Sequence, residues 1–199
     1  MIKLENTEVH GIARAIYSAR NAMNSWDKSD SDFVTDTLGE NDLRLARNLV
    51  KAGSDHSKFM RMINVTVDIT APLYWWKEAD TYKVGTVRNS CSTMHKVHAK
   101  EFELDDFSHD HLPENNTVLA YIICALNVYR KNFLETKDKS WWWQIIQLLP
   151  SSYNQRATLQ LNYAVLRNIY HSRNNHKLDC WHTFCHWIES LPYSELITA

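Results

Sequence analysis

One polar stretch, DTYKVGTVRNSCSTMH at residues 80–95, carries side chains well suited to binding an anion. It combines a lysine and a glycine with small hydroxyl and amide side chains, and the candidates are Lys83, Thr86, Asn89, Ser90 and Ser92. Lysine supplies a point charge, and hydroxyl and amide groups donate hydrogen bonds to phosphate or carboxylate oxygens. The same residue types also populate ordinary surface turns. The residues alone leave both interpretations open.

A group of candidate metal ligands lies near the carboxyl end. His182, Cys185 and His186 occupy positions i, i+3 and i+4 of an expected helix, a spacing that suits zinc. No Cys-x-x-Cys pair or His-Glu-x-x-His motif accompanies them, and we predict no metal site. Other histidines are interpreted as parts of solvated polar loops: His95, His98, His109 and His111.

Two tryptophan clusters, at 75–76 and 141–143, could stack a flavin or a base. Adjacent residues on a helix point in different directions, so neither cluster can face one pocket as a whole. We therefore expect these side chains in the core or at a subunit interface.

Composition narrows the class of protein. A chain of 199 residues fits one domain, expected to span 1–199. The formal net charge of -1 gives no surplus of Lys and Arg for tracking a nucleic-acid polymer. No apolar run approaches the roughly 18 residues that a membrane span needs, and the first residues lack the features of a signal peptide. We expect a cytoplasmic protein whose four cysteines are free thiols.

The elements that must position these residues follow from hydrophobic periodicity. Alternation of apolar and polar residues across 62–70 predicts a half-buried strand that Pro72 ends. A second helix is expected to begin near Asn41 and to stop at Gly53. The other stretches predict helices: 8–24, 72–82, 117–134, 140–149, 152–172 and 177–190.

The order of these pieces resembles the flavin-dependent (ThyX-type) thymidylate synthases. Residues 148–192, LLPSSYNQRATLQLNYAVLRNIYHSRNNHKLDCWHTFCHWIESLP, fall where that family has a Leu-Pro, an Asn-x-Arg helix, a later Asn and an Arg. GSDHSKFMRMINVTVDITAP, at 53–72, resembles its His-containing segment before a strand. The loop at 80–95 falls on the signature Arg-His-Arg-x-x-Ser, Asn-Glu and Ser-x-Arg. The resemblance covers residues 40–190 and implies a mostly helical α+β domain with a small antiparallel sheet.

The resemblance also implies roles near the carboxyl end. Arg173 falls where the family has an arginine that contacts the uracil of its substrate. Asn162 and Asn168 fall where it has asparagines near the flavin. The family further implies a homotetramer whose pockets are shared between subunits.

On the loop, the family's pattern is partly retained. Asn89 and Ser92 fall on its Asn and second Ser, and Thr86 can replace the first Ser if one extra residue lies between Thr86 and Asn89. Several of the family's charged residues are replaced, and the substitutes here are Thr81, Tyr82, Lys83, Ser90, Met94, Ile146 and Ala164. Guanidinium groups grip phosphates bidentately, so their loss implies altered or absent binding of flavin and dUMP.

Three hypotheses follow. We favour a nucleotide-binding protein without standard thymidylate synthase activity, which sequesters a nucleotide or a nucleotide-derived signal, as a sponge of viral or prophage type would. It would need no cofactor. The alternative is a flavoenzyme that uses FAD to methylate dUMP or a related pyrimidine nucleotide. The binder is favoured over it because fixing a flavin against its substrate requires the side chains that are lost here. The third is a structural scaffold with a relict pocket.

Overall fold

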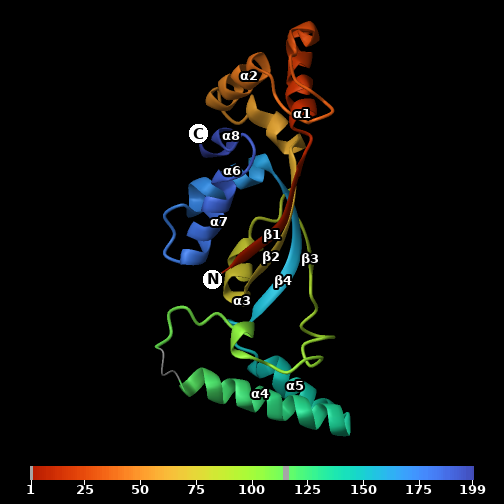
Figure 1. Cartoon of the computed structure of the whole chain (residues 1–199), viewed down its shortest axis with the longest axis vertical. Helices are drawn as coiled ribbons and strands as arrows, with labels where there is room; N and C mark the ends of the chain where they lie inside the picture. The colour runs from red at the N-terminus through yellow and green to blue at the C-terminus, as the bar shows by residue number, and fades with distance from the viewer. Residues whose placement is uncertain (1, 114–116) are drawn as a thin grey trace. The chain divides into compact units, whose positions relative to one another are not determined.

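The computed structural model describes residues 2–113 and 117–199, and Figure 1 labels its elements. The longer elements, in chain order, are β1 (Lys3–His10), α1 (Ile12–Ala19), α2 (Glu40–Lys51), β2 (Asn64–Pro72), α3 (Leu73–Ala79), β3 (Val87–Ser90), α4 (Thr117–Thr136), α5 (Lys139–Leu148), β4 (Asn154–Asn162), α6 (Tyr163–Arg173), α7 (Asp179–Glu189) and α8 (Glu195–Thr198). Short 3-10 helices are η1 (Arg20–Met23), η2 (Trp26–Lys28), η3 (Ser57–Met62) and η4 (Leu104–Asp106).

The strands form one four-stranded antiparallel sheet in the order β1-β2-β4-β3. Strict alternation explains the two central strands. In β2, Val65, Val67 and Ile69 are fully buried and alternate with more exposed residues. In β4, Ala157 and Leu161 belong to the buried set that alternates with exposed polar side chains. The mostly helical α+β class expected from the sequence is therefore confirmed, as is the strand expected at 62–70.

Two predicted helices are wrong at their starts. The region 8–24 begins with the end of β1, and its helix starts only at Ile12, because Gly11 adopts a left-handed conformation with φ of 88°. The Asp36 carboxylate then accepts hydrogen bonds from the backbone N–H groups of Gly11, Ile12 and Ala13 at 2.7–3.1 Å. Likewise, 152–172 divides into β4 and α6. Sheet pairing with distant strands overrides the helical pattern there.

The other expected helices are confirmed within a few residues at α2, α3, α4, α5 and α7. The start of α2 differs in detail, since it follows Gly39 instead of being capped by Asn41. The Asp30 carboxylate accepts from the N–H groups of Asn41 and Asp42, at 2.9 and 3.0 Å. A side chain outside the helix thus provides the N-terminal hydrogen bonds.

The described residues form two compact units. The first contains residues 2–3, 69–81, 89–113 and 117–157, and the second contains 4–68, 82–88 and 158–199. In the first unit, α4 and α5 lie side by side (Figure 1) and share a core with the loops before them. That core includes Val97, Phe102, Phe107, Leu126 and Ile145. That residues 1–199 form a single domain stays a prediction.

The second unit is built from packed helices, with α6 contacting η3, α7 and α8. Its interior also holds a buried ion pair, in which Arg20 Nη2 lies 2.5 Å from Asp42 Oδ1. The other Asp42 oxygen accepts hydrogen bonds from the Ser29 and Ser31 hydroxyls, each at 2.6 Å. Buried charges of this kind are tolerated when they are paired and hydrogen-bonded, and this pair ties the segment 20–31 to α2.

Within residues 2–113 and 117–199, no helix has the length and apolar character needed to cross a membrane.

Candidate functional site

The first half of the 80–95 loop forms a tight turn. The Thr86 N–H donates to the Lys83 carbonyl at 3.3 Å, and Gly85 has a φ of 78°. The Thr86 hydroxyl donates to the Tyr82 carbonyl at 2.6 Å. Thr86 therefore has a structural role in the turn, whereas the Lys83 side chain is exposed.

Arg173, in the last turn of α6, contacts the start of this loop. Its Nε donates to the Tyr82 hydroxyl at 2.9 Å. Its Cζ lies 5.0 Å from the centre of the Trp181 ring and 5.6 Å from that of Tyr82, distances typical of cation–π contacts. Residues 91 positions apart are thus brought together within the second unit, and the guanidinium is held by aromatic neighbours.

The two asparagines expected near a cofactor lie on α6 and at its start. Asn162 is the N-cap of this helix, and its Oδ1 accepts from the Val165 N–H at 3.1 Å. A Cβ added to Gly85 would lie 3.0 Å from Asn162 Nδ2, so the turn needs a glycine both for its φ and for this close approach. Asn168 is exposed on α6.

The second half of the loop belongs to the first unit and is organised differently. Asn89 and Ser90 lie in β3 and not in a loop as expected. Ser92 begins a turn, because its hydroxyl accepts from the His95 N–H at 3.0 Å and its carbonyl from the Lys96 N–H at 3.3 Å. The Ser92 hydroxyl hydrogen can still be donated to a ligand, since a hydroxyl is both donor and acceptor.

Beside Ser92 lies a cavity of about 240 Å³, which we call the Ser92 cavity. Its floor includes the buried side chains of Val97 and Phe102. Cationic side chains outnumber carboxylates in its lining by three to one. The polar and charged residues that line it include Ser92, Thr93, Lys96, Lys100, Asp106, Gln155 and Arg156.

Backbone and buried side-chain hydrogen bonds fix the wall of this cavity. The Cys91 N–H donates to the Arg156 carbonyl at 2.9 Å, and Gln155 Nε2 donates to the Cys91 carbonyl at 2.6 Å. Gln155 is only 8% exposed, and its own carbonyl accepts from Trp76 Nε1 at 3.0 Å. The loop after β3 is therefore held firmly against β4.

Charge in the cavity is partly balanced. Lys100 Nζ lies 2.5 Å from Asp106 Oδ1, and this hydrogen bond raises the pKa of Lys100 above its ordinary value. Lys100 therefore stays protonated at neutral pH. Lys96 and Arg156 are exposed at the cavity. The arrangement can bind a small anion.

The predicted core positions hold for one tryptophan cluster. Trp75 and Trp76 are 0% and 2% exposed, in agreement with a core role. In the second cluster Trp143 is 49% exposed, and Trp142 Nε1 donates to the Met94 carbonyl at 3.1 Å.

The helix with metal-ligand spacing is α7, in which Cys185 is buried. Burial, followed by the charge of Glu189, raises the pKa of Cys185 to about 11. This thiol disfavours the thiolate that zinc requires. Among the residues that the structure describes, no group of His, Cys, Asp and Glu side chains is arranged to hold a metal ion.

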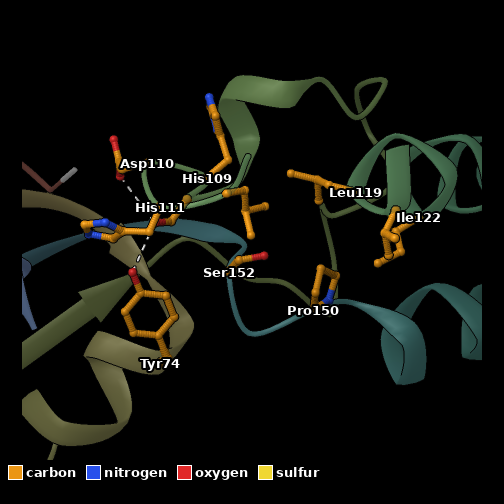
Figure 2. A pocket seen from close by; sticks show the side chains of 11 residues that line it. Tyr74, His109, Asp110, His111, Leu119, Ile122, Pro150 and Ser152 are labelled. Carbon is orange, nitrogen blue, oxygen red and sulfur yellow. Dashed lines mark hydrogen bonds between the residues drawn. The ribbon is translucent and has the colours of Figure 1, made fainter. Parts of the chain in front are cut away.

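A second cavity, of about 390 Å³, was not anticipated from the sequence (Figure 2). The Tyr74 hydroxyl lies 3.0 Å from Ser108 Oγ, which in turn lies 3.5 Å from Asp110 Oδ2. Figure 2 shows Leu119 and Ile122 on the opposite side of this cavity. His109 and His111, interpreted from the sequence as parts of a solvated polar loop, both line this cavity, and His111 is exposed.

His98 also differs from the solvated position expected for it. Its ring lies 4.8 Å from that of Phe133, and the side chain is half-buried. Burial, and then the charge of Lys137, lowers the pKa of His98, which favours a neutral imidazole.

Comparison with solved structures identifies the fold. A Helicobacter pylori flavin-dependent thymidylate synthase ThyX complexed with FAD and dUMP aligns with a TM-score of 0.75 and 18% identity, over 98% of both chains. Another structure of Helicobacter pylori ThyX with FAD and dUMP aligns with a TM-score of 0.76 and 16% identity, over 100% of both chains. No family model and no curated protein matches the sequence. The chain has the ThyX fold, as the resemblance predicted.

Proposed function

We propose that this chain is a small-molecule nucleotide-binding protein on a ThyX fold, without standard thymidylate synthase activity. The observation that carries the proposal is the contact of Arg173 with Tyr82 beside the Lys83 turn. This contact places a cation at the start of the predicted anion-binding loop, within a fold whose solved examples hold FAD and dUMP.

The substitutions argue against the family's chemistry. Tyr82 stands where the signature has a histidine, and its hydroxyl accepts a hydrogen bond from Arg173. Met94 and Ala164 stand where the family has arginines, and neither side chain can donate a hydrogen bond. A binder tolerates these losses better than a flavoenzyme, since catalysis needs reactants positioned to within about 1 Å.

The alternative is a flavoenzyme acting on dUMP or a related pyrimidine nucleotide. Retention of Asn162 and Asn168 favours it, as does alignment over the full length of structures that contain FAD and dUMP. Asn162, however, already caps α6. That hydrogen bond accounts for the residue without a cofactor.

Purified protein distinguishes the two functions. A binder should be colourless and should bind dUMP or another nucleotide in calorimetry without releasing tritium from C5-labelled dUMP. A yellow protein with bound FAD that releases tritium when reduced nicotinamide and methylenetetrahydrofolate are added would identify the enzyme. A protein that binds no nucleotide would leave only the scaffold.

The biological role that fits a binder without turnover is sequestration of a nucleotide or nucleotide-derived signal in the cytoplasm, as in a phage sponge protein. If the protein sequesters its ligand, the ligand should co-purify with the protein and should be chemically unchanged. Mass spectrometry of the small molecules released on denaturation tests this directly. Recovery of an intact nucleotide supports the role, whereas recovery of a methylated product contradicts it.

A further inference from the structure

We infer that the cavity shown in Figure 2 is a binding site for a small neutral molecule that is largely apolar and carries a hydrogen-bond donor, such as a hydroxyl group on an aromatic ring. A neighbouring cavity of about 610 Å³ extends the site, since it shares the lining residues His109, Asp110, Leu112 and Leu119. Every lining residue belongs to the first unit. The inference goes beyond the proposed function and does not depend on nucleotide binding.

Apolar side chains that are exposed to solvent gather at this site. Leu104, Leu112 and Val118 are 51%, 43% and 64% exposed, and each lines at least one of the two cavities. Leu119 is buried and Ile122 is half-buried, and Figure 2 shows both on the side opposite the polar groups. Apolar surface that is gathered in a concavity and rimmed by polar side chains is typical of a ligand site. Volumes of about 390 and 610 Å³ are in the range of small-molecule pockets.

His109, which lines both cavities, provides the hydrogen-bond acceptor. Its Nδ1 lies 2.8 Å from the Phe107 carbonyl oxygen, and because a carbonyl can only accept, Nδ1 carries the hydrogen. In the neutral ring Nε2 is then an acceptor. The backbone beside His109 is fixed, since Phe107 is buried and the Ser108 N–H donates to the Ser152 carbonyl at 2.7 Å. A hydroxyl or N–H group of a ligand therefore meets an acceptor whose tautomer is already set.

The charge of the lining disfavours anions. Among the residues that the structure describes, no lysine or arginine lines either cavity. The carboxylate of Asp110 does line both, and it accepts a hydrogen bond from the Ser108 hydroxyl at 3.5 Å. A phosphate or carboxylate would lose its water here without a lysine or arginine to pair with it. We therefore expect the site to take neutral molecules and to reject nucleotides.

Naphthol, methoxynaphthalene and naphthoate test the class of ligand by calorimetry with the full chain. The first has a hydrogen-bond donor, the second lacks it, and the third is an anion of similar size. We expect naphthol to bind about 2- to 12-fold more tightly than methoxynaphthalene, the range that one neutral hydrogen bond provides. Naphthoate should bind more weakly than both. His109→Phe removes the acceptor and keeps an apolar ring, so naphthol and methoxynaphthalene should bind this variant equally.

Two exposed valines of α4 give a matched pair of variants. Val118 lines the cavity of Figure 2, whereas Val128 lines neither cavity. Val118→Trp should weaken naphthol binding by about tenfold or more, because the indole ring occupies the space of the ligand. Val128→Trp should bind naphthol as the wild-type protein does. Circular dichroism and thermal unfolding confirm that each variant is folded.

The other outcomes overturn the inference. These are failure of the wild-type protein to bind naphthol, binding of naphthoate as tight as that of naphthol, an unchanged naphthol preference in His109→Phe, and equal binding by the two tryptophan variants. Light scattering tests a second copy of the chain as the occupant, since dissociation of an oligomer by Val118→Trp alone would make this face a subunit contact. Nucleotide affinity should be the same in Val118→Trp and the wild-type protein, so failure of the proposed function is measured separately.

Discussion

Replacing Arg173 with alanine should lower both ligand affinity and the stability of the fold. The side chain donates one hydrogen bond to Tyr82 and lies over the rings of Tyr82 and Trp181. A hydrogen bond from a charged donor contributes about 1.5–3 kcal/mol, and each exposed cation–π contact about 0.5–1 kcal/mol. Because Arg173 is half-buried, solvent reduces these values. We expect the free energy of unfolding to fall by about 2 kcal/mol.

Urea unfolding followed by tryptophan fluorescence measures this loss, and Tm should fall by about 4–8 °C for a chain of this length. Tyr82→Phe retains the ring and removes only the hydroxyl that accepts the Arg173 hydrogen bond. We expect it to lower the free energy of unfolding by about 1 kcal/mol. Arg14→Ala is the matched control, because Arg14 is exposed and its Cζ lies 5.2 Å from the centre of the Tyr17 ring. Its loss should lower the free energy of unfolding by less than about 1 kcal/mol.

The effect on ligand affinity is measured by calorimetry with dUMP, at a temperature where the variant is folded. Loss of a charge-assisted contact predicts about 10- to 150-fold weaker binding in Arg173→Ala. Arg173→Lys should bind with intermediate affinity, since it keeps the charge but loses the planar fork. The reasoning would be refuted if Arg173→Ala unfolded no more easily than Arg14→Ala and bound dUMP as the wild-type protein does.

The remaining predictions concern stability, assembly and activity. Asp42→Asn should lower the free energy of unfolding in urea by about 3–5 kcal/mol, because it leaves the Arg20 charge buried without its partner. A decrease below about 1 kcal/mol would contradict this. Burial raises the pKa of Asp42, but hydrogen bonds from Ser29 and Ser31 and the charge of Arg20 outweigh it and lower the pKa. A lowered folded-state pKa gives stability that is present above about pH 4 and lost as the pH falls through the folded value, so acid should destabilise the wild-type protein more steeply than Asp42→Asn. Light scattering should return a homotetramer, and a mass near 23.4 kDa at micromolar concentration would exclude it. The gene should not rescue a thymidine-requiring host, whereas growth without thymidine would show that the lost arginines are dispensable; Ala164→Arg tests whether restoring one of them restores flavin binding.

The elements with strong local patterns were predictable from the sequence. Strand β2 alternates strictly, and α4, α5 and α7 carry apolar stripes long enough to identify helices. The order of the Leu-Pro, Asn-x-x and Arg pieces also indicated the ThyX fold, which the solved structures confirm. The helices and the strand were predictable because each depends on residues close together in the chain, and the fold was predictable because the order of the pieces can be read along the sequence.

Long-range pairing was decided only by the tertiary structure. Strand β1 has a weak local signal, and β4 alternates but lies in the stretch 152–172 that was predicted as one helix, so both strands were identified only by their neighbours in the sheet. The carboxylate of Asp36 starts a helix 23–25 residues earlier in the chain, and Tyr82 meets Arg173 across 91 residues.

The same distinction applies to the candidate site. Residue types alone singled out Ser92, yet only the pairing of the loop after β3 with β4 brings Arg156 to the same cavity. Local periodicity and side-chain chemistry therefore determined which elements and functional groups the chain contains. Hydrogen bonding and burial between distant segments decided which of those groups meet, because backbone donors and acceptors must be satisfied by whichever segment the fold places beside them.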